Sequence, residues 1–419
     1  MVLKNEEVIS ENNSSKQQPK FKLKSSDFVW ILFLGILPFD KSALTFYLSD
    51  KIGSFISLFL NGCTLITAII CVYNMRKSKI HIRLSLKYAI IFAVLLVVYL
   101  FASLTDEISI MRLFSLVCVL GYYIFSICYY KNVDELVKDV NIALFFIIIL
   151  SVIYGIFNVP EVMYSENSTK YVFKGVVLNR NSYSEISLFY LVTNFYLVWK
   201  TNKYKIFRLI SSIIAIVTTI LTNGTTSILC TGLLLVLLLG CYFTNVRKYY
   251  YFTIFAIAYA VIFIIFVLGP SMNFNIVQYV GKFLGKSETL TGRTDIWGVS
   301  LDCYIKSAIV GYGYDTNILF ENQIHVGVPH NGILHILLTQ GTIGLLVFLA
   351  MLSFIVINDR NKQLKDDKLY IVMLSFLVVW LIKGLVESVL YYTHFVFWIA
   401  LIIMELRVHY NKEKNSERQ

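Results

Sequence analysis

Arg293 and His330 are the residues of this chain whose types and surroundings best fit chemistry on a phosphate. Arg293 follows Gly292, and His330 is followed by Asn331. A guanidinium can hold two phosphate oxygens through parallel hydrogen bonds. An imidazole, which titrates near neutrality, can take the proton of an attacking hydroxyl. The pair therefore indicates transfer of a group from a phosphate to a hydroxyl, with His330 acting either as the base or as a neutral hydrogen-bond donor.

A short amphipathic helix is predicted to begin at Arg293. Apolar residues recur along one stripe of such a helix at Ile296, Trp297, Leu301, Tyr304, Ile305 and Ala308. Thr291 is the expected N-cap. It places Arg293 in the first turn, where free backbone N–H groups and the helix dipole favour an anion. The alternative is an arginine that only reaches lipid headgroups.

The composition predicts a polytopic membrane protein that holds these residues in place. Of its 419 residues 57% are hydrophobic, and the mean hydropathy is +0.68, too apolar for a soluble globular protein. We predict an all-α fold with about twelve transmembrane helices and a large external loop that contains the amphipathic helix, since about 20 apolar residues cross a bilayer. The predicted spans are 28–48, 52–73, 88–104, 109–130, 140–157, 182–199, 206–222, 225–243, 249–268, 331–357, 369–386 and 389–406.

The distribution of Lys and Arg predicts the orientation of the chain. Most of these 37 residues fall in segments that share one side of the membrane, and cytoplasmic loops collect such residues. Both termini are therefore predicted inside, and the net charge of +11 requires no nucleic-acid partner. The predicted regions are a cytoplasmic tail at 1–26, spans one to nine over 27–268 with an external loop at 158–181, an external catalytic loop at 269–330, spans ten to twelve over 331–406, and a second cytoplasmic tail at 407–419.

Several polar groups lie at similar predicted depth, near the outer ends of their spans. They are Arg112, Glu185, His335, Lys383, Glu387 and His394. Because a charge at the bilayer centre costs about 2.5 to 3.5 kcal/mol, their shared depth predicts a cavity at the outer face. Each could also be structural: a charge near a helix end can reach the headgroups, and Lys383 and Glu387, four residues apart, could neutralise each other.

The motifs in and around the large loop resemble the O-antigen ligase and polymerase family of bacterial membrane glycosyltransferases. His330-Asn331, nine residues, Gly341, two residues and Gly344 is similar to the histidine motif of that family. The resemblance extends over about 171–344 and is topological elsewhere. It also includes Thr291-Gly292-Arg293-Thr294-Asp295-Ile296-Trp297, Gly311-Tyr312-Gly313, Gly175 and Asn179-Arg180-Asn181.

The resemblance implies a glycosyltransferase of the C-type fold that acts on undecaprenyl diphosphate-linked sugars at the outer face of the bacterial cytoplasmic membrane. It implies no metal and no cofactor. Arg293 would bind the diphosphate, and His330 would be the essential histidine. Arg180, Lys174 and Arg112 are further candidates for the diphosphate, and Asn331, Asn179, Glu387 and Lys383 are candidate supporting residues.

The acceptor distinguishes two versions of this activity. A polymerase extends a lipid-linked repeat unit for O-antigen, capsule or exopolysaccharide, with a chain-length regulator and a flippase as expected membrane partners. A ligase transfers the glycan to a lipopolysaccharide core. Many ligases carry a Ser-Arg or Thr-Arg pair in the outer turn where this chain has Leu221-Thr222-Asn223-Gly224-Thr225, which favours the polymerase. A lipid-linked sugar transporter is the alternative from another class, although its binding charges would be expected near the midplane.

Overall fold

The architecture is known from a computed structural model of the chain. It describes residues 30–31, 59, 62–70, 72–73, 79–102, 110–130, 132–157, 172–201, 203–244, 252–268, 293–313, 318–322, 326–358, 364–390 and 395–416. Most of the first predicted span, part of the second, Thr291, His394, most of the predicted 158–181 loop and half of the predicted 269–330 loop lie outside these residues. The number of spans therefore stays a prediction.

The described chain is all helical, which confirms the predicted class. Its elements are α4 (Lys79–Ala102), α5 (Ile110–Tyr129), α6 (Val133–Ile156), α8 (Arg180–Lys200), α9 (Lys205–Leu221), α10 (Thr225–Phe243), α11 (Phe252–Phe263), the π-helical turn η4 (Ile264–Leu268), α13 (Arg293–Lys306), α14 (Ile318–Glu321), α15 (Gly332–Asn358), the 3₁₀ turn η6 (Leu364–Asp366), α16 (Lys368–Gly384) and α17 (Phe395–Ser416).

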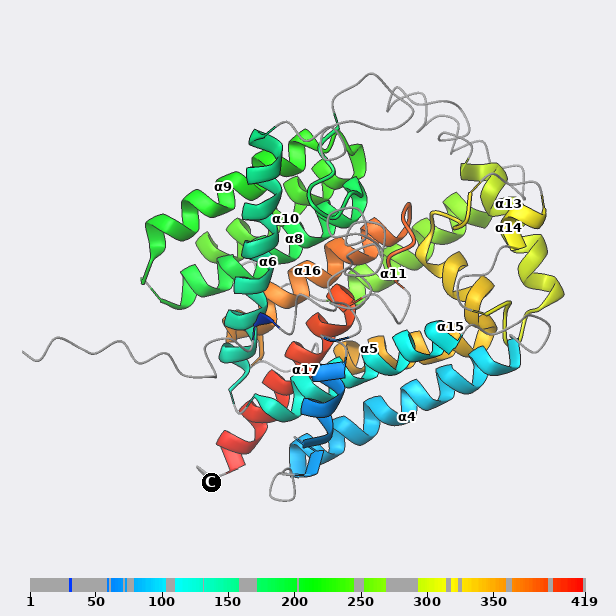
Figure 1. Cartoon of the computed structure of the whole chain (residues 1–419), viewed down its shortest axis with the longest axis horizontal. Helices are drawn as coiled ribbons and strands as arrows, with labels where there is room; N and C mark the ends of the chain where they lie inside the picture. Colours follow the sequence, from blue (N-terminus) through cyan, green and yellow to red (C-terminus); the bar gives the residue numbers. More distant parts are fainter. Residues whose placement is uncertain are drawn as a thin grey trace, which may run out of the picture.

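Two groups of helices flank the buried pair α16 and α17. Figure 1 shows α6, α8, α9 and α10 on one side and α4, α5 and α15 on the other, with α13 and α14 at one end beyond α15. Nearly every residue of α16 is buried, including Phe376 and Trp380. A helix that is apolar around its whole circumference belongs in the core, so α16 forms the centre of the bundle.

Four of the described helices are long and apolar enough to cross a membrane: Ile82–Ala102, Val133–Ile156, Thr225–Phe243 and Gly332–Asn358. Exposed apolar side chains also cover the outer side of α9, at Ile206, Ile210, Ile213, Val217 and Ile220. A surface of this kind is stable against lipid and costly against water. The chain is therefore a helical membrane protein.

The twelfth predicted span begins too early. The sequence predicts it at 389–406, whereas Val389 and Leu390 are not helical and α17 begins at Phe395. The indole N–H of Trp380 donates to the carbonyl of Val389 at 3.0 Å, and Leu390 fits closely over Gly332. Tertiary contacts therefore hold residues 385–390 as a turn, although hydropathy alone favours a helix.

The backbone conformation at Gly341 explains why the histidine motif has a glycine at this position. It interrupts α15 with φ 61° and ψ −159°, a backbone conformation that is open essentially only to glycine. At this break the amide of Tyr312 donates to the carbonyl of Leu338 at 2.7 Å, and the amide of Thr342 donates to the carbonyl of Ala308 at 2.8 Å. The break thus joins α15 to the segment that follows α13.

We expect Gly341→Ala to destabilise the protein. The new Cβ would lie 2.3 Å from the carbonyl oxygen of Ile309, and the positive φ adds on the order of 1–3 kcal/mol of backbone strain. Gly298→Ala is the matched control, because a Cβ at this α13 position meets nothing within 4 Å. Thermal unfolding in detergent should show a clearly lower Tm for the first variant only. Equal Tm values would show that the break tolerates a side chain.

Candidate active site

One carboxylate, that of Glu387, lies next to groups from three other segments. Arg293 Nη2 donates to Glu387 Oε1 at 3.2 Å, and Asn181 Nδ2 donates to Glu387 Oε2 at 3.3 Å. His330 Nδ1 lies 3.6 Å from Glu387 Oε2, which is ion-pair distance and beyond a hydrogen bond. The candidate site is defined by these four residues, Asn181, Arg293, His330 and Glu387.

Four separate elements supply the candidate site. Arg293 is the first residue of α13, Asn181 stands in the first turn of α8, His330 precedes α15, and Glu387 lies in the turn after α16. The sequence prediction that Arg293 lies in a first helical turn is confirmed. Residues that are distant in the chain therefore meet at one end of the bundle.

His330 is held from both sides in a strained conformation. Its φ is +49°, a left-handed value that is uncommon for a residue other than glycine. On one side, the Trp297 indole of α13 donates to the carbonyl of Pro329 at 3.0 Å. On the other, Asn331 Nδ2 donates to the carbonyl of Leu385 at 2.9 Å. Strain of this kind persists only where the surroundings hold it, and it is concentrated at functional sites.

Asn331 has a structural basis for its supporting role. It is fully buried, and its side-chain oxygen accepts the amide of Leu334 at 3.0 Å. This bond satisfies a free N–H of the first turn of α15. The same amide side chain therefore starts α15 and ties it to the turn that carries Glu387.

Arg293 and His330 remain accessible to a ligand. Their side chains are 22% and 31% exposed, whereas that of Glu387 is 10% exposed. A guanidinium has five N–H donors, and the hydrogen bond from Arg293 Nη2 to Glu387 uses one of them. Arg293 could therefore bind phosphate oxygens while Glu387 still orients it.

A buried ion pair joins α16 to α8. Lys383 Nζ donates to Glu185 Oε1 at 3.0 Å and to Ser184 Oγ at 3.2 Å, and Ser227 Oγ donates to Ser184 Oγ at 2.8 Å. The idea that Lys383 and Glu387 neutralise each other is thus wrong: Lys383 pairs with α8, and Glu387 pairs with α13. A buried charge of either sign needs such a partner.

The three residues of the Asn179-Arg180-Asn181 segment have different structural roles. Asn179 Oδ1 accepts the amides of Asn181 and Ser182 at 2.9 and 3.2 Å, so it is the N-cap of α8. Because it occupies these two N–H groups, they are not free for a phosphate. Arg180 is exposed at the same helix start, where its guanidinium could reach a ligand.

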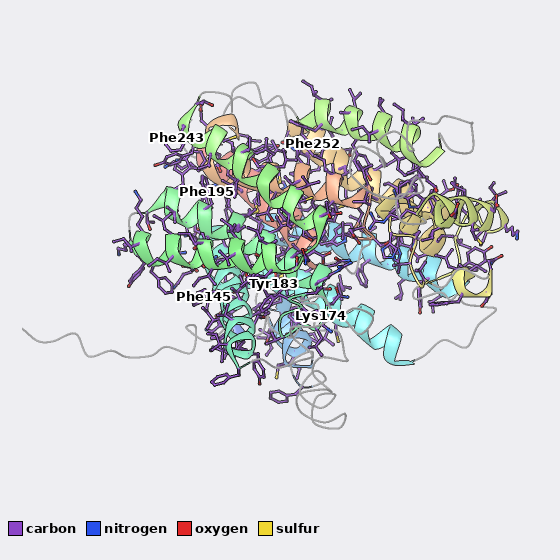
Figure 2. The ribbon with its side chains drawn as sticks, turned by 90° about the horizontal axis from the view of Figure 1, so that it is seen from above. Phe145, Lys174, Tyr183, Phe195, Phe243 and Phe252 are labelled. Carbon is purple, nitrogen blue, oxygen red and sulfur yellow. The ribbon has the colours of Figure 1, made fainter. Side chains whose placement is uncertain are left out.

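Lys174 lies in a turn that packs over the start of α8. Gly175 has φ +64°, and a Cβ there would lie 2.3 Å from the ring of Tyr183. The amide of Phe173 donates to the carbonyl of Leu221 at 3.0 Å, beside the turn that joins α9 to α10. Figure 2 shows Lys174 close to Tyr183. The side chain of Lys174 is half-buried.

The remaining candidates are less defined. Arg112 belongs to α5, but its side chain is not among those described. His335 is half-buried on α15, one turn beyond Asn331. The outer-face cavity stays a prediction.

The opposite end of the bundle is also polar. Arg407 Nε donates to Asp367 Oδ2 at 2.8 Å, and Lys200 pairs with Asp134. Asp134, Lys200 and Asp367 lie at helix ends and Arg407 lies within α17, and all four fall in segments that the sequence predicts to be cytoplasmic. The predicted inner ends thus meet one another, as the predicted outer ends do at Glu387.

The fold and the candidate site define a helical membrane protein with a charged cluster at one end of its bundle. Residues 210–349 match the family model described as O-antigen ligase, which supports the resemblance seen in the motifs. The match includes Arg293, His330 and Gly341, whereas Asn181 and Glu387 lie outside it. No curated protein matches the chain. The family match and the apolar helices support a ligase-like or polymerase-like membrane enzyme.

Sequence reasoning missed the contribution of two residues to the candidate site. The sequence shows Asn181 only as part of the Asn179-Arg180-Asn181 motif, and it shows Trp297 only as part of an apolar stripe. The indole N–H is the signal for Trp297, because a buried tryptophan usually donates to a partner. For Asn181, its place two residues after the N-cap Asn179 was the available signal.

Proposed function

We propose that the protein is a polysaccharide polymerase. It transfers a glycan from undecaprenyl diphosphate to a lipid-linked repeat unit at the outer face of the cytoplasmic membrane. The observation that carries the proposal is the meeting of Arg293 and His330 at Glu387, within and beside the segment that matches the ligase family. Arg293 and His330 are accessible, and the site lies at the helix ends predicted to face outward.

The proposed reaction is a direct displacement at the anomeric carbon. The acceptor hydroxyl oxygen forms a bond to this carbon as the bond from carbon to phosphate oxygen breaks, which inverts the configuration. The electron pair leaves with undecaprenyl diphosphate. Arg293 and the exposed Arg180 stabilise its growing negative charge, with Lys174 and Arg112 as further cations. No step requires a metal ion.

The acceptor proton leaves by way of His330 if this residue is the base. Glu387 lies near Nδ1, so a proton on that nitrogen would face the carboxylate and leave Nε2 as the acceptor. If His330 is instead a neutral donor, it hydrogen-bonds a phosphate or sugar oxygen. In both versions Glu387 is a positioning residue for Arg293 and His330.

The turn between α9 and α10 supports the polymerase over the ligase. In the described turn, Thr222, Asn223 and Gly224 occupy the place where many ligases have an arginine. The Thr222 hydroxyl donates to the carbonyl of Thr219 at 2.7 Å. None of these three residues carries a positive charge that could replace the arginine. A transporter has less support, because the charged cluster lies at a helix end and away from the midplane.

The decisive experiment uses purified protein, a defined undecaprenyl diphosphate repeat unit and a chelator. A ladder of products is expected without added metal. Addition of lipopolysaccharide core should then give no core-linked product. A single core-linked product would identify a ligase, a need for metal would contradict the mechanism, and lipid movement across vesicles without any product would identify a transporter.

Cysteine labelling tests the proposed orientation, in which both termini are cytoplasmic. Cysteines introduced as Ser168→Cys and Ser287→Cys, which lie outside the described residues, should react with an impermeant thiol reagent in intact cells or spheroplasts. Lys203→Cys, at an exposed position before α9, should react only after lysis. Native Cys303 is buried, and burial raises the pKa of its thiol, so it should label slowly; it is replaced in all variants. The reverse pattern would overturn the orientation.

A further inference from the structure

A second polar site lies in the other half of the bundle, between α6, α8 and α9. A cavity of about 360 Å³ is lined there by Asn141, Ile142, Phe145, Tyr190, Asn194, Tyr204, Phe207 and Arg208. Arg208 belongs to the first turns of α9, and Asn194 to the last turns of α8. These are helix ends that the sequence predicts to be cytoplasmic, so the cavity is separate from the Glu387 cluster.

Arg208 is a cation whose partners among the described residues are neutral. Its Nη1 donates to the side-chain oxygens of Asn194 at 3.0 Å and Asn141 at 3.3 Å, which are neutral partners. Its Nε is buried and has no hydrogen-bond partner. Among the described residues, no carboxylate lies within ion-pair distance of it. A half-buried guanidinium favours an anionic partner, and the described residues supply none.

The two asparagines hold the guanidinium in a fixed place. Asn141 Nδ2 donates to Thr193 Oγ1 at 3.0 Å, and Asn194 Nδ2 donates to Ser212 Oγ and to the backbone carbonyl of Arg208, both at 2.8 Å. These bonds direct both amide oxygens toward Arg208. The cation is therefore preorganised at the wall of the cavity, as a binding site requires.

The start of α9 adds to the positive potential. Tyr204, its N-cap, has φ +57° and makes no side-chain cap hydrogen bond, so the first N–H groups lack that partner. Lys203 and Lys205 flank it and are exposed. A helix N-terminus and adjacent cations both favour an anion.

The rest of the cavity is apolar and faces the lipid side of the bundle. Phe145 packs edge-on against Phe207 with 5.3 Å between ring centroids and lies 6.1 Å from the ring of Tyr190. Phe207 and Tyr204, which line the cavity, are also exposed on its outer side. A ligand with both an anionic head and hydrocarbon chains fits this combination better than a free anion.

We propose that this cavity binds an anionic phospholipid of the cytoplasmic leaflet. Arg208 and the start of α9 hold the phosphate, and the acyl chains lie against the apolar rings of Phe145 and Phe207. The lipid completes the charge balance of Arg208 and links three helices. The inference does not depend on the enzymatic reaction.

Native mass spectrometry of the purified full chain tests the proposal. The probes are phosphatidylglycerol, phosphatidylethanolamine and inorganic phosphate. Arg208→Gln removes the charge, and Ile142→Trp fills the cavity while leaving the Arg208 bonds intact. Arg83→Gln is the matched control, because Arg83 is an exposed arginine on α4 that is also predicted inside.

We expect one retained phosphatidylglycerol in the parent protein and in Arg83→Gln. Its affinity should fall about tenfold or more in Arg208→Gln, as expected for loss of charge-assisted hydrogen bonds, and fall similarly in Ile142→Trp. Equal binding of phosphatidylethanolamine, displacement by millimolar inorganic phosphate, or unchanged retention in Ile142→Trp would each overturn the proposal. If Arg208→Gln does not fold, the other comparisons decide.

Discussion

Replacement of Arg293 by lysine is expected to reduce glycosyl transfer by about a hundredfold, the scale for loss of one fixed donor to a developing anion. Lysine keeps the positive charge next to Glu387, so the pair that joins α13 to the turn after α16 can persist. It cannot reproduce the planar fork that holds two phosphate oxygens. The variant therefore separates phosphate recognition from folding.

The measurement compares initial rates on a defined lipid-diphosphate repeat at equal protein levels. Lys306→Gln is the control, because it removes an exposed cation from the last turn of the same helix and should leave the rate nearly unchanged. If Arg293 only anchors α13 to headgroups, lysine would serve as well. Normal turnover of Arg293→Lys would therefore exclude Arg293 from the diphosphate site.

The helices themselves were largely predictable from the sequence. The span predicted at 225–243 coincides with α10, and the one at 206–222 differs from α9 by one residue at each end. Such segments are continuous apolar runs bounded by polar residues, and the membrane leaves few other solutions. Where polar residues continue a helix beyond the apolar run, the prediction fell short. α6 begins at Val133 because Asn132 caps it, seven residues before the predicted start.

The pairing of charges was not predictable in the same way. Spacing along one helix favours a contact between Lys383 and Glu387, but α16 ends at Gly384. The choice of Glu185 as the partner depends on which faces of α8 and α16 meet, and that is set by packing across the whole bundle. The role of Glu387 as a shared partner likewise exists only once α13 and the His330 segment have docked.

The glycines of the histidine motif were also only partly interpretable from the sequence. Their spacing was visible and pointed to a family, but spacing does not reveal a backbone angle. The structure supplies the cause for Gly341, which breaks α15 so that the segment after α13 can pair with it. Trp297 of α13 then reaches Pro329. The break therefore acts on His330 through the docking of α13.

Replacement of His330 by glutamine should reduce turnover by about 10² to 10⁴-fold if the residue is the general base. Glutamine can still donate a hydrogen bond but cannot accept a proton. With the histidine present, the rate should fall as the pH is lowered and the imidazole becomes protonated. This acid limb should disappear from the residual activity of the variant.

The alternative role gives a different result for the same variant. If His330 only donates a hydrogen bond to a phosphate or sugar oxygen, His330→Gln should keep near-normal turnover, and any acid limb should persist because another group causes it. His335→Gln is the control, since His335 is a half-buried histidine on the same helix outside the Glu387 cluster. The full pH profile of turnover, measured with matched protein levels, distinguishes the two roles. The contacts of Trp297 with Pro329 and of Asn331 with Leu385 do not involve the imidazole, so they should keep the segment in place in the variant. An inactive but folded His330→Gln enzyme beside an active His335→Gln enzyme would therefore assign proton transfer to His330.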